Sequence, residues 1–379
     1  MSLIVMNRPG KEDTQMEHPK INRREFLETG GKIAVGLAAA SLPLATGACY
    51  SRVSPTPAVS VVRIRNDKVD YAVEEAIDLI GGIKEATRGK ELIMLKPNLV
   101  NASPSATTKP QVVEALARLM KGSGKEVLIG EGSAAAEGFN VRGEEVFRTR
   151  KREILDGMQQ HVFDALGYTE LAKSLKVPLV NLHTGEMDEV EVPGAFVFDK
   201  LTLHRSLREI DLLCSVPMMK THGLAHVTLG MKNLIGVYPG LVYQSVRGHM
   251  HDVASAVEPS ATAGPVVDMV RANKLGLVVV DASTAMEGQG PAEGDLVKMD
   301  LIIAGTNPVA TDMVTASIMG FQPREIPTFT WANKAGLTPT GLGGIEVRGE
   351  RIENVRRDFA RPEIRTWKSV RKTWAVKEI

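Results

Sequence analysis

Lysines, acidic residues and a histidine follow short apolar runs at several separate places in this chain. The runs comprise residues 91–95, 126–129, 211–216, 276–280 and 301–304. Unalternated runs of this length are typical of parallel strands buried on both faces of a sheet. In open sheets of this kind, ligands bind beyond the carboxyl ends of the strands. The polar residues that follow the runs include Lys96, Asn98, Glu131, Lys220, His222, Asp281, Glu287 and Asp312.

We expect these residues to gather along one edge of the sheet. The alternative for any single run is that its polar ending is an ordinary turn, because turns favour polar residues and glycine. The recurrence of lysines and acids at several endings favours a site.

The densest basic segment spans residues 220–252. It holds Lys220, Lys232, one arginine and four histidines, interleaved with glycines. Several donors of this kind can surround one small anion, such as a carboxylate or a phosphate group. We expect Lys96, Lys220 and Lys232 to bind such a ligand, with Asn98, Glu131, Asn233 and Asp312 beside them. A lysine taken singly is more often a solvated surface charge.

Two further groups of residues could hold a divalent transition metal. His249, His251 and Asp252 are ligand types suited to zinc, iron or manganese, and in a strand the two histidines would share a face. The alternative is that His222 or His249 transfers a proton. Asp281 and Glu287, which we expect in one loop, could hold a metal, act as general acid and base, or neutralise nearby lysines.

The surrounding elements predict a doubly wound, mostly parallel α/β sheet with helices on both faces. Strands are expected at 61–64, 92–95, 127–130, 277–281 and 301–304, and helices at 69–87, 110–121, 265–273 and 309–319. Residues 137–175 are mostly polar and predict a helical insertion whose charged stretch, 148–152, faces water. Residues 177–192 predict a short antiparallel excursion.

Composition and missing motifs exclude several classes of function. The chain has 379 residues and a formal net charge of +1, so no overall field favours nucleic acid. Cys49 and Cys214 are its two cysteines, too few for an iron–sulfur cluster, so none is expected in this chain. No dinucleotide fingerprint, phosphate-binding P-loop or nucleophile elbow is present, which argues against dehydrogenases, nucleotide hydrolases and serine hydrolases.

The amino-terminal residues predict an export signal. Arg23 and Arg24 form a twin-arginine pair, and residues 33–45 are apolar and rich in glycine and alanine. We therefore expect export by the twin-arginine translocase to the periplasm. Small residues before Cys49 permit ordinary cleavage and also resemble a lipoprotein site, although Thr46 stands where leucine is usual. The alternative is a chance arginine pair ahead of a buried helix.

The expected organisation is a signal with an anchor site (1–50), a tether (51–60), an α/β domain (61–320) and a carboxyl-terminal extension (321–379). In the extension, Ile364, Trp367, Val370 and Trp374 recur at near-helical spacing among basic residues. This pattern predicts an amphipathic helix docked on the domain. The alternative is contact with an anionic membrane surface.

Several segments together resemble the domain-of-unknown-function 362 (DUF362) family between Leu92 and Phe321. They are Lys96-Pro97-Asn98, Lys220-Thr221-His222, residues 227–236, His249, residues 286–291 and residues 305–312. The resemblance implies that these positions form one motif set. Some relatives append a ferredoxin-type module, which implies a redox protein partner, but this chain lacks the cysteines of that module.

Two functions remain open from the sequence. The first is an exported enzyme that acts on a small carboxylate- or phosphate-bearing ligand, with His222 or His249 moving a proton and Asp281 and Glu287 holding a metal or orienting a base. The second is a non-catalytic binding or maturation factor for a redox partner or cofactor. A third hypothesis is that the chain is a structural surface protein. The substrate, the metal and the oligomeric state are not determined by the sequence.

Overall fold

The computed structural model describes residues 56–372 and 377–379. The predicted export signal, Cys49 and Trp374 lie outside these residues. Within them, no helix combines the length and the apolar composition needed to cross a membrane.

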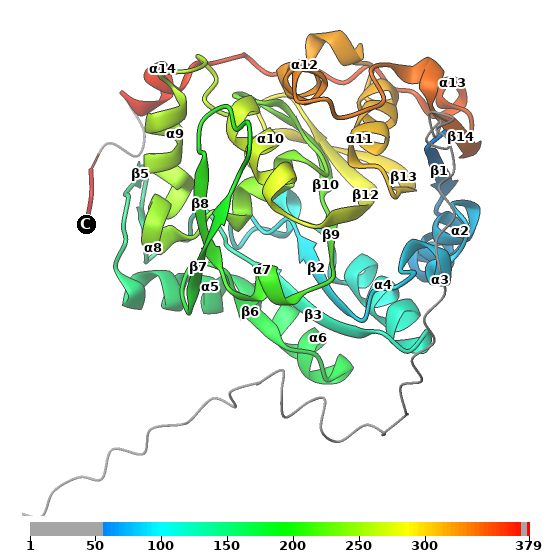
Figure 1. Cartoon of the computed structure of the whole chain (residues 1–379), viewed down its shortest axis with the longest axis horizontal. Coiled ribbons are helices and arrows are strands. Elements are labelled where there is room, and N and C mark those ends of the chain that lie inside the picture. Colours follow the sequence, from blue (N-terminus) through cyan, green and yellow to red (C-terminus); the bar gives the residue numbers. More distant parts are fainter. Residues whose placement is uncertain (1–55, 373–376) are drawn as a thin grey trace, which may run out of the picture. The chain divides into compact units, whose positions relative to one another are not determined.

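One ten-stranded sheet organises the described part of the chain (Figure 1). Its strand order is β14-β1-β13-β12-β9-β2-β3-β6, with β10 and β11 forming a hairpin on β12. The bounds are β1 Ala58–Arg63, β2 Leu92–Pro97, β3 Glu126–Glu131, β6 Leu179–Asn181, β9 Leu212–Val216, β10 Met218–His222, β11 His226–Thr228, β12 Leu275–Glu287, β13 Asp295–Gly305 and β14 Glu346–Gly349.

The sheet is mostly parallel, which confirms the predicted α/β class. Neighbouring strands from β12 through β9, β2 and β3 to β6 all run parallel. β13 is antiparallel to both of its neighbours, β1 and β12. The short apolar runs became strands because both of their faces are covered by helices and removed from water.

Helices cover both faces of the sheet, as predicted. One hydrophobic cluster joins one face to α2 (Val69–Leu79), α4 (Pro110–Gly122), α5 (Arg152–Ala165) and α6 (Tyr168–Leu175). A second cluster joins the other face to α10 (Ala263–Ala272), α11 (Pro308–Ile318) and α12 (Pro327–Lys334). Alternate residues of a strand therefore enter different clusters: Ile93 and Leu95 face the first, and Met94 faces the second.

Several element boundaries differ from those predicted. The helix expected over 69–87 is divided into α2 and α3 (Ile83–Ala86), because Gly81 and Gly82 take φ of 111° and 84° and interrupt the helical backbone. β1 begins at Ala58, so the last residues of the expected tether belong to the sheet.

The prediction that Asp281 and Glu287 lie in one loop is wrong, because this segment is the second half of strand β12. Antiparallel pairing with β13 continues from Thr284 to Glu287 beyond a register shift at Ala282. Six residues of extended chain span about 20 Å. Asp281 and Glu287 are therefore carried apart rather than folded back on each other.

The run at 301–304 also differs from expectation, because β13 is antiparallel to its neighbours. Its last residue, Gly305, pairs with Val278 in the first half of β12. Asn307 follows this end of β13, which runs toward the start of β12 rather than toward its carboxyl end. There its side chain caps α11 by accepting a hydrogen bond from Ala310 N at 2.9 Å.

The insertion at 137–175 contains α5 and α6, and also a small hairpin of β4 (Val141–Arg142) and β5 (Glu145–Val146). Arg148, which was expected to face water, is buried because the chain terminus pairs with it. Its guanidinium forms an ion pair with Asp252 at 2.6 Å. The predicted antiparallel excursion is formed by β7 (Met187–Glu191) and β8 (Lys200–His204).

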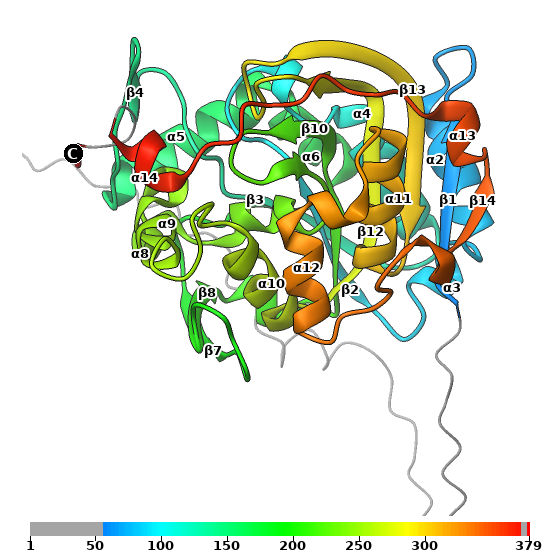
Figure 2. The ribbon, with the colours of Figure 1, turned by 90° about the horizontal axis from the view of Figure 1, so that it is seen from above.

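Residues 356–371, the C-terminal strap, cross the sheet edge that carries the end of β12. Figure 2 shows this segment in red, running from α13 (Ile352–Val355) to α14 (Trp367–Arg371). Ala360 N donates to Glu287 Oε2 at 3.0 Å, and Arg365 N donates to the Gly223 carbonyl at 2.8 Å. The strap therefore ties the end of β12 to the β10–β11 hairpin.

Docking of the carboxyl-terminal segment on the domain is confirmed at Trp367, although α14 is much shorter than the predicted helix. Trp367 is 1% exposed, whereas Ile364 is 48% exposed. The Trp367 indole stacks on His251 and donates to Asp252 Oδ1 at 2.8 Å. A membrane contact by the same segment remains a prediction.

We predict that Trp367→Ala lowers the free energy of unfolding by about 3–5 kcal/mol, because it leaves a cavity and removes a buried aromatic side chain. Ile364→Ala in the same strap is the matched control and should change stability by less than about 0.5 kcal/mol. Urea denaturation of both variants measures this difference. Equal effects of the two substitutions would contradict the docking described here.

Candidate functional site

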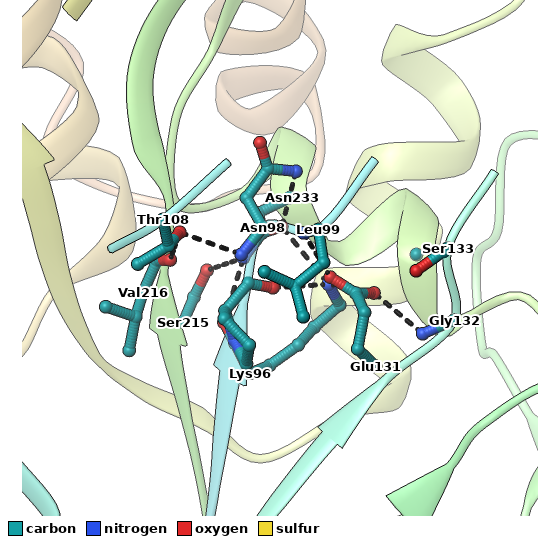
Figure 3. Close-up of polar contacts among 12 residues, drawn as sticks. Lys96, Asn98, Leu99, Thr108, Glu131, Gly132, Ser133, Ser215, Val216 and Asn233 are labelled. Atoms are coloured by element: carbon teal, nitrogen blue, oxygen red, sulfur yellow. Dashed lines mark hydrogen bonds and ion pairs between the residues drawn. The ribbon is translucent and has the colours of Figure 1, made fainter. Parts of the chain in front are cut away.

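A buried ion pair joins the ends of β2 and β3. The sheet register places Lys96 opposite Ser215 of β9 and brings Glu131 to the end of the adjacent strand. Lys96 Nζ lies 2.8 Å from Glu131 Oε1, and the two side chains are 0% and 2% exposed (Figure 3). Burying two charges is costly unless each is also hydrogen-bonded.

Both members of the pair have further partners. The Glu131 carboxylate accepts from Gly132 N at 2.7 Å and from Leu99 N at 2.9 Å. Lys96 Nζ also donates to the Pro97 carbonyl and to Asn233 Oδ1, each at 3.1 Å. Burial lowers the pKa of Lys96, and Glu131 opposes that shift. Three acceptors around Nζ match the three donors of an ammonium.

Asn233 links this pair to β9. Its Nδ2 donates to the Lys96 carbonyl and to Ser215 Oγ, each at 3.0 Å, and Ser215 Oγ donates to the Gly230 carbonyl. Asn98 Nδ2 donates to Asn233 Oδ1 at 3.2 Å. Asn98 Oδ1 is buried without a partner. A buried amide oxygen of this kind is an available acceptor at the site.

Two glycines allow the chain to pass close to the ion pair. A Cβ atom at Gly236 would lie 2.7 Å from Lys96 Nζ, and one at Gly132 would lie 2.6 Å from the Gly236 carbonyl. Both distances are shorter than side chains tolerate. These positions require glycine because of close approach rather than unusual backbone angles.

Arg247 is buried on the other side of the same glycines. Its guanidinium donates to the carbonyls of Gly132, Ser133 and Gly236, at 3.0 Å for Ser133 and 2.7 Å for Gly236. It has no carboxylate ion-pair partner among the residues that the structure describes. Burial lowers the pKa of Arg247 to about 10.

The segment that delivers Arg247 is strained. Gln244, Val246 and Arg247 have φ of 64°, 50° and 56°. The left-handed region is unfavourable for residues other than glycine, and most of all for a β-branched residue such as Val246. Each such residue costs on the order of 1–3 kcal/mol and is usually found at a functional site.

Lys220 and Lys232 complete a group of four cations with Lys96 and Arg247, which we call the cationic cluster. Lys220 Nζ is buried and donates to the carbonyls of Ala106 at 2.6 Å and Pro291 at 3.0 Å. Lys232 is partly buried, and within the described residues its amine has no hydrogen-bond or ion-pair partner.

The charges of the cluster act on one another. Burial, followed by the charge of Lys232, lowers the pKa of Lys220 to about 7. Burial, followed by the charges of Arg247 and Lys96, lowers the pKa of Lys232 to about 7. The charge of Glu131 opposes the lowering of the pKa of Lys96, Lys220 and Arg247. The cluster therefore carries more positive than negative charge.

The histidines beside the cluster are neutral. His222 Nδ1 accepts from Leu224 N at 3.0 Å and Ala225 N at 3.3 Å, so its proton lies on Nε2. Burial and the charges of Lys232 and Lys220 hold the pKa of His222 well below its usual value. Burial, followed by Lys232, lowers the pKa of His251 to about 3. His222 is therefore a hydrogen-bond donor rather than a cation.

The expected metal group of His249, His251 and Asp252 is not assembled. These residues lie on helix α9 (Gly248–Ala254), so the two histidines do not share a face as they would in a strand. His249 is exposed beside Tyr243, and His251 Nδ1 bonds the Ala261 carbonyl at 2.8 Å. Among the described residues, no three His, Cys, Asp or Glu side chains are grouped to hold a metal ion.

Three predicted acidic residues have partners other than the lysines. Asp281 accepts from Lys109 N at 2.8 Å, at the start of α4, and from the Ser283 hydroxyl at 2.6 Å. Glu287 pairs with Arg357 of the strap at 3.4 Å. Asp312 accepts from the backbone N–H groups of residues 230 and 231, each at 2.8 Å, and burial raises its pKa to about 7.

The structure thus brings together Lys96, Asn98, Glu131, Lys220, His222, Lys232 and Asn233 from the predicted set. His249 and Glu287 do not join them. Sequence reasoning counted Arg247 among the donors of residues 220–252 but did not list it as a site residue, and it gave no role to Ser215, Gly132 or Gly236. The glycines interleaved with basic residues were a usable sequence signal that the backbone passes close to other atoms. No sequence pattern indicated the positive φ of Arg247.

Comparisons with known proteins identify the family. The profile of the DUF362 family, described as a domain of unknown function, matches residues 93–317. The chain belongs to the DUF362 family. All four members of the cationic cluster and Glu131 lie inside the matched region, and the C-terminal strap lies outside it.

One curated relative and two solved structures are similar to this DUF362 protein. The thylakoid-associated protein sll1697 of Synechocystis sp. is 25% identical over 267 residues, 70% of this chain and 74% of the relative. The lactate racemase apoprotein of Thermoanaerobacterium thermosaccharolyticum aligns with a TM-score of 0.41 and 14% identity, over 73% of this chain and 59% of that chain. A Thermotoga maritima protein aligns with a TM-score of 0.36 and 13% identity, over 64% and 56%. This chain therefore spans less than two thirds of either solved structure.

We predict that Glu131→Gln lowers the free energy of unfolding by about 3–5 kcal/mol, because it leaves the buried Lys96 ammonium without a counter-charge among three other cations. Glu126→Gln is the matched control, since Glu126 begins the same strand and is exposed. Urea denaturation distinguishes the two. An unchanged stability of Glu131→Gln would show that the ion pair does not hold the strand ends together.

Proposed function

We propose that the cationic cluster binds a small ligand bearing a carboxylate or phosphate group. The observation behind this proposal is the charge imbalance of the site. The charges of Lys96, Lys220, Lys232 and Arg247 act on one another, and Glu131 forms its ion pair with Lys96. Unbalanced charge in a poorly hydrated region is unfavourable. A bound anion would supply the missing negative charge.

The ligand would reach the cluster from the side of Lys232 and His222. These two side chains are partly exposed, whereas Lys96, Lys220 and Arg247 are buried. The amine of Lys232 and Nε2–H of His222 have no partners within the described residues and so are available as donors. Charge-assisted hydrogen bonds of this kind are the strong ones.

We further propose that the protein is an enzyme in which lysine amines, rather than histidines, exchange protons. A group that transfers protons works best when its pKa lies near the working pH. Lys220 and Lys232 meet this condition, with pKa values lowered to about 7. His222 does not, because its pKa lies well below its usual value. This assignment replaces the expected proton transfer by His222 or His249.

The second candidate is a binding or maturation factor that holds an anionic ligand or cofactor for a redox partner. It uses the same cluster, so ligand affinity does not separate it from the enzyme. Native mass spectrometry does. An organic molecule retained in stoichiometric amount through purification favours the factor, whereas turnover of an added ligand favours the enzyme.

We predict that sulfate, a tetrahedral oxyanion like phosphate whose charge does not change in this range, binds about tenfold more tightly at pH 6 than at pH 8.5, measured by isothermal titration calorimetry. Below pH 7 both amines are protonated and attract the anion, and above pH 7 they lose that charge. Loss of one charge-assisted contact worth about 1.4 kcal/mol gives this factor. Lys232→Met should weaken binding at pH 6 and flatten the pH dependence.

The matched control is Lys298→Met, since the Lys298 side chain is 69% exposed and pairs with Asp300 on the surface. This variant should bind sulfate like the unsubstituted protein. Equal affinity at the two pH values, or full affinity in Lys232→Met, would reject the cationic cluster as the binding site.

For localisation, we propose export by the twin-arginine translocase to the periplasm. The support is the Arg23-Arg24 pair ahead of an apolar segment. Replacement of both arginines by lysine should retain the protein in the cytoplasm of a bacterium with this translocase, as read by fractionation and immunoblotting. Arg8→Lys is the control that should leave export intact. An unchanged periplasmic fraction in the double variant would reject this route.

A further inference from the structure

We propose that Lys232 is a nucleophile that forms an imine with the carbonyl carbon of an anionic oxo compound, such as a 2-oxo carboxylate or an aldehyde phosphate. This inference rests on the proposed anion site and names the class of substrate for it. Lys220 Nζ, with two acceptors for its three donors, and Arg247 Nε, which is buried without a partner, would donate to the carboxylate or phosphate group, and Lys232 would receive the carbonyl carbon.

Lys232 differs from the other cations of the cluster because its amine has no partner among residues 56–372 and 377–379, while its backbone is held in place. Its neighbours in sequence are anchored: Met231 N donates to Asp312, and the Asn233 side chain donates to the Lys96 carbonyl and Ser215 Oγ. Lys232 begins the short helical turn η2 (Lys232–Val237) between these anchors. The Cα position is therefore set, while the amine keeps the freedom to react.

The other amines of the cluster are occupied. Lys96 Nζ has three hydrogen-bond acceptors, including the Glu131 carboxylate. Lys220 Nζ is held by the carbonyls of Ala106 and Pro291. Neither can attack a carbonyl carbon without losing these bonds in a buried site. Lys232 has no such bonds to break within the described residues.

The chemical environment supports this role. An ammonium is not nucleophilic, and lysines that form imines are activated by desolvation or by nearby cations. Arg247 and Lys96 are cations close enough to act on the charge of Lys232, and together with burial they lower its pKa to about 7. A large fraction of Lys232 is therefore the free amine at neutral pH.

The step balances without an added oxidant or reductant. The lone pair of Lys232 Nζ forms a bond to the carbonyl carbon, and the electrons of the C=O double bond move to oxygen. Both amine protons then pass to that oxygen, which leaves as water when the C–O bond breaks, and a neutral imine remains. His222 Nε2–H can donate a hydrogen bond to the oxygen while it carries negative charge.

The test uses glyoxylate as the probe, with sodium cyanoborohydride to reduce any imine to a stable carboxymethyl-lysine. The full chain is incubated at pH 7 with both reagents, and peptide mass spectrometry locates the adducts. We expect one equivalent on Lys232, formed about a hundredfold faster than on exposed Lys298, since a lysine of ordinary pKa has little free amine at this pH. Acetaldehyde, which has no anionic group, should label Lys232 with less preference.

Two variants make the result specific. Lys232→Arg should remove the single adduct while keeping the cationic charge. Lys298→Arg also keeps the charge, and it should leave the adduct on Lys232 unchanged. Labelling of the unsubstituted chain needs no variant, so a folding defect in Lys232→Arg cannot conceal the answer. Adducts spread evenly over the exposed lysines, or unchanged by Lys232→Arg, would overturn the inference.

Sulfate calorimetry on the same preparation separates the two proposals. Sulfate binding without a Lys232 adduct rejects the nucleophile and leaves the proposed anion site supported. Absence of both sulfate binding and the Lys232 adduct rejects the anion site as well.

Discussion

The Lys96–Glu131 ion pair is the interaction on which the rest of this site depends. It joins the ends of two adjacent parallel strands at a point that water does not reach. Its two charges are tolerated because backbone N–H groups, a carbonyl and the Asn233 amide satisfy their remaining hydrogen-bonding capacity. Gly132 and Gly236 are part of the same requirement, because side chains at either position would overlap the pair or its neighbours.

Because Glu131 is paired with Lys96, the positive charges of Lys220, Lys232 and Arg247 have no carboxylate ion-pair partner among the described residues. Lys96 uses the Glu131 carboxylate, and Lys220 and Arg247 are held by backbone carbonyls. Carbonyl oxygens satisfy donors but do not neutralise charge. Burial, together with the mutual repulsion that follows, lowers the pKa of both Lys220 and Lys232 and keeps His222 neutral. A stretch of strained backbone at residues 244–247 delivers Arg247 into this repulsive environment, which is typical of a segment retained for function rather than stability.

The sequence predicted the sheet class and the part of the site that depends only on parallel strand ends. Lys96, Glu131 and Lys220 follow buried apolar runs, and parallel neighbours bring them to one edge. Glu287 could not be placed in this way, because pairing between β12 and β13 extends the strand past its apolar run. The direction of β13 could not be predicted from its apolar run, because antiparallel pairing with β1 and β12 decides it. His249 does not join the site because the segment that begins at Gly248 forms helix α9. For Glu287 and for β13, pairing between strands decided the outcome, and no single apolar run reveals that pairing.

The central claim is that Lys220 and Lys232 share a crowded positive environment in the folded protein. Lysine side-chain NMR on protein labelled with ¹³C at Cε, titrated from pH 5 to 11 and assigned with Lys220→Arg and Lys232→Arg, measures this directly. Two resonances should titrate near pH 7 and disappear one at a time in the two variants. Titration of both amines near their usual value of about 10.4 would contradict the account.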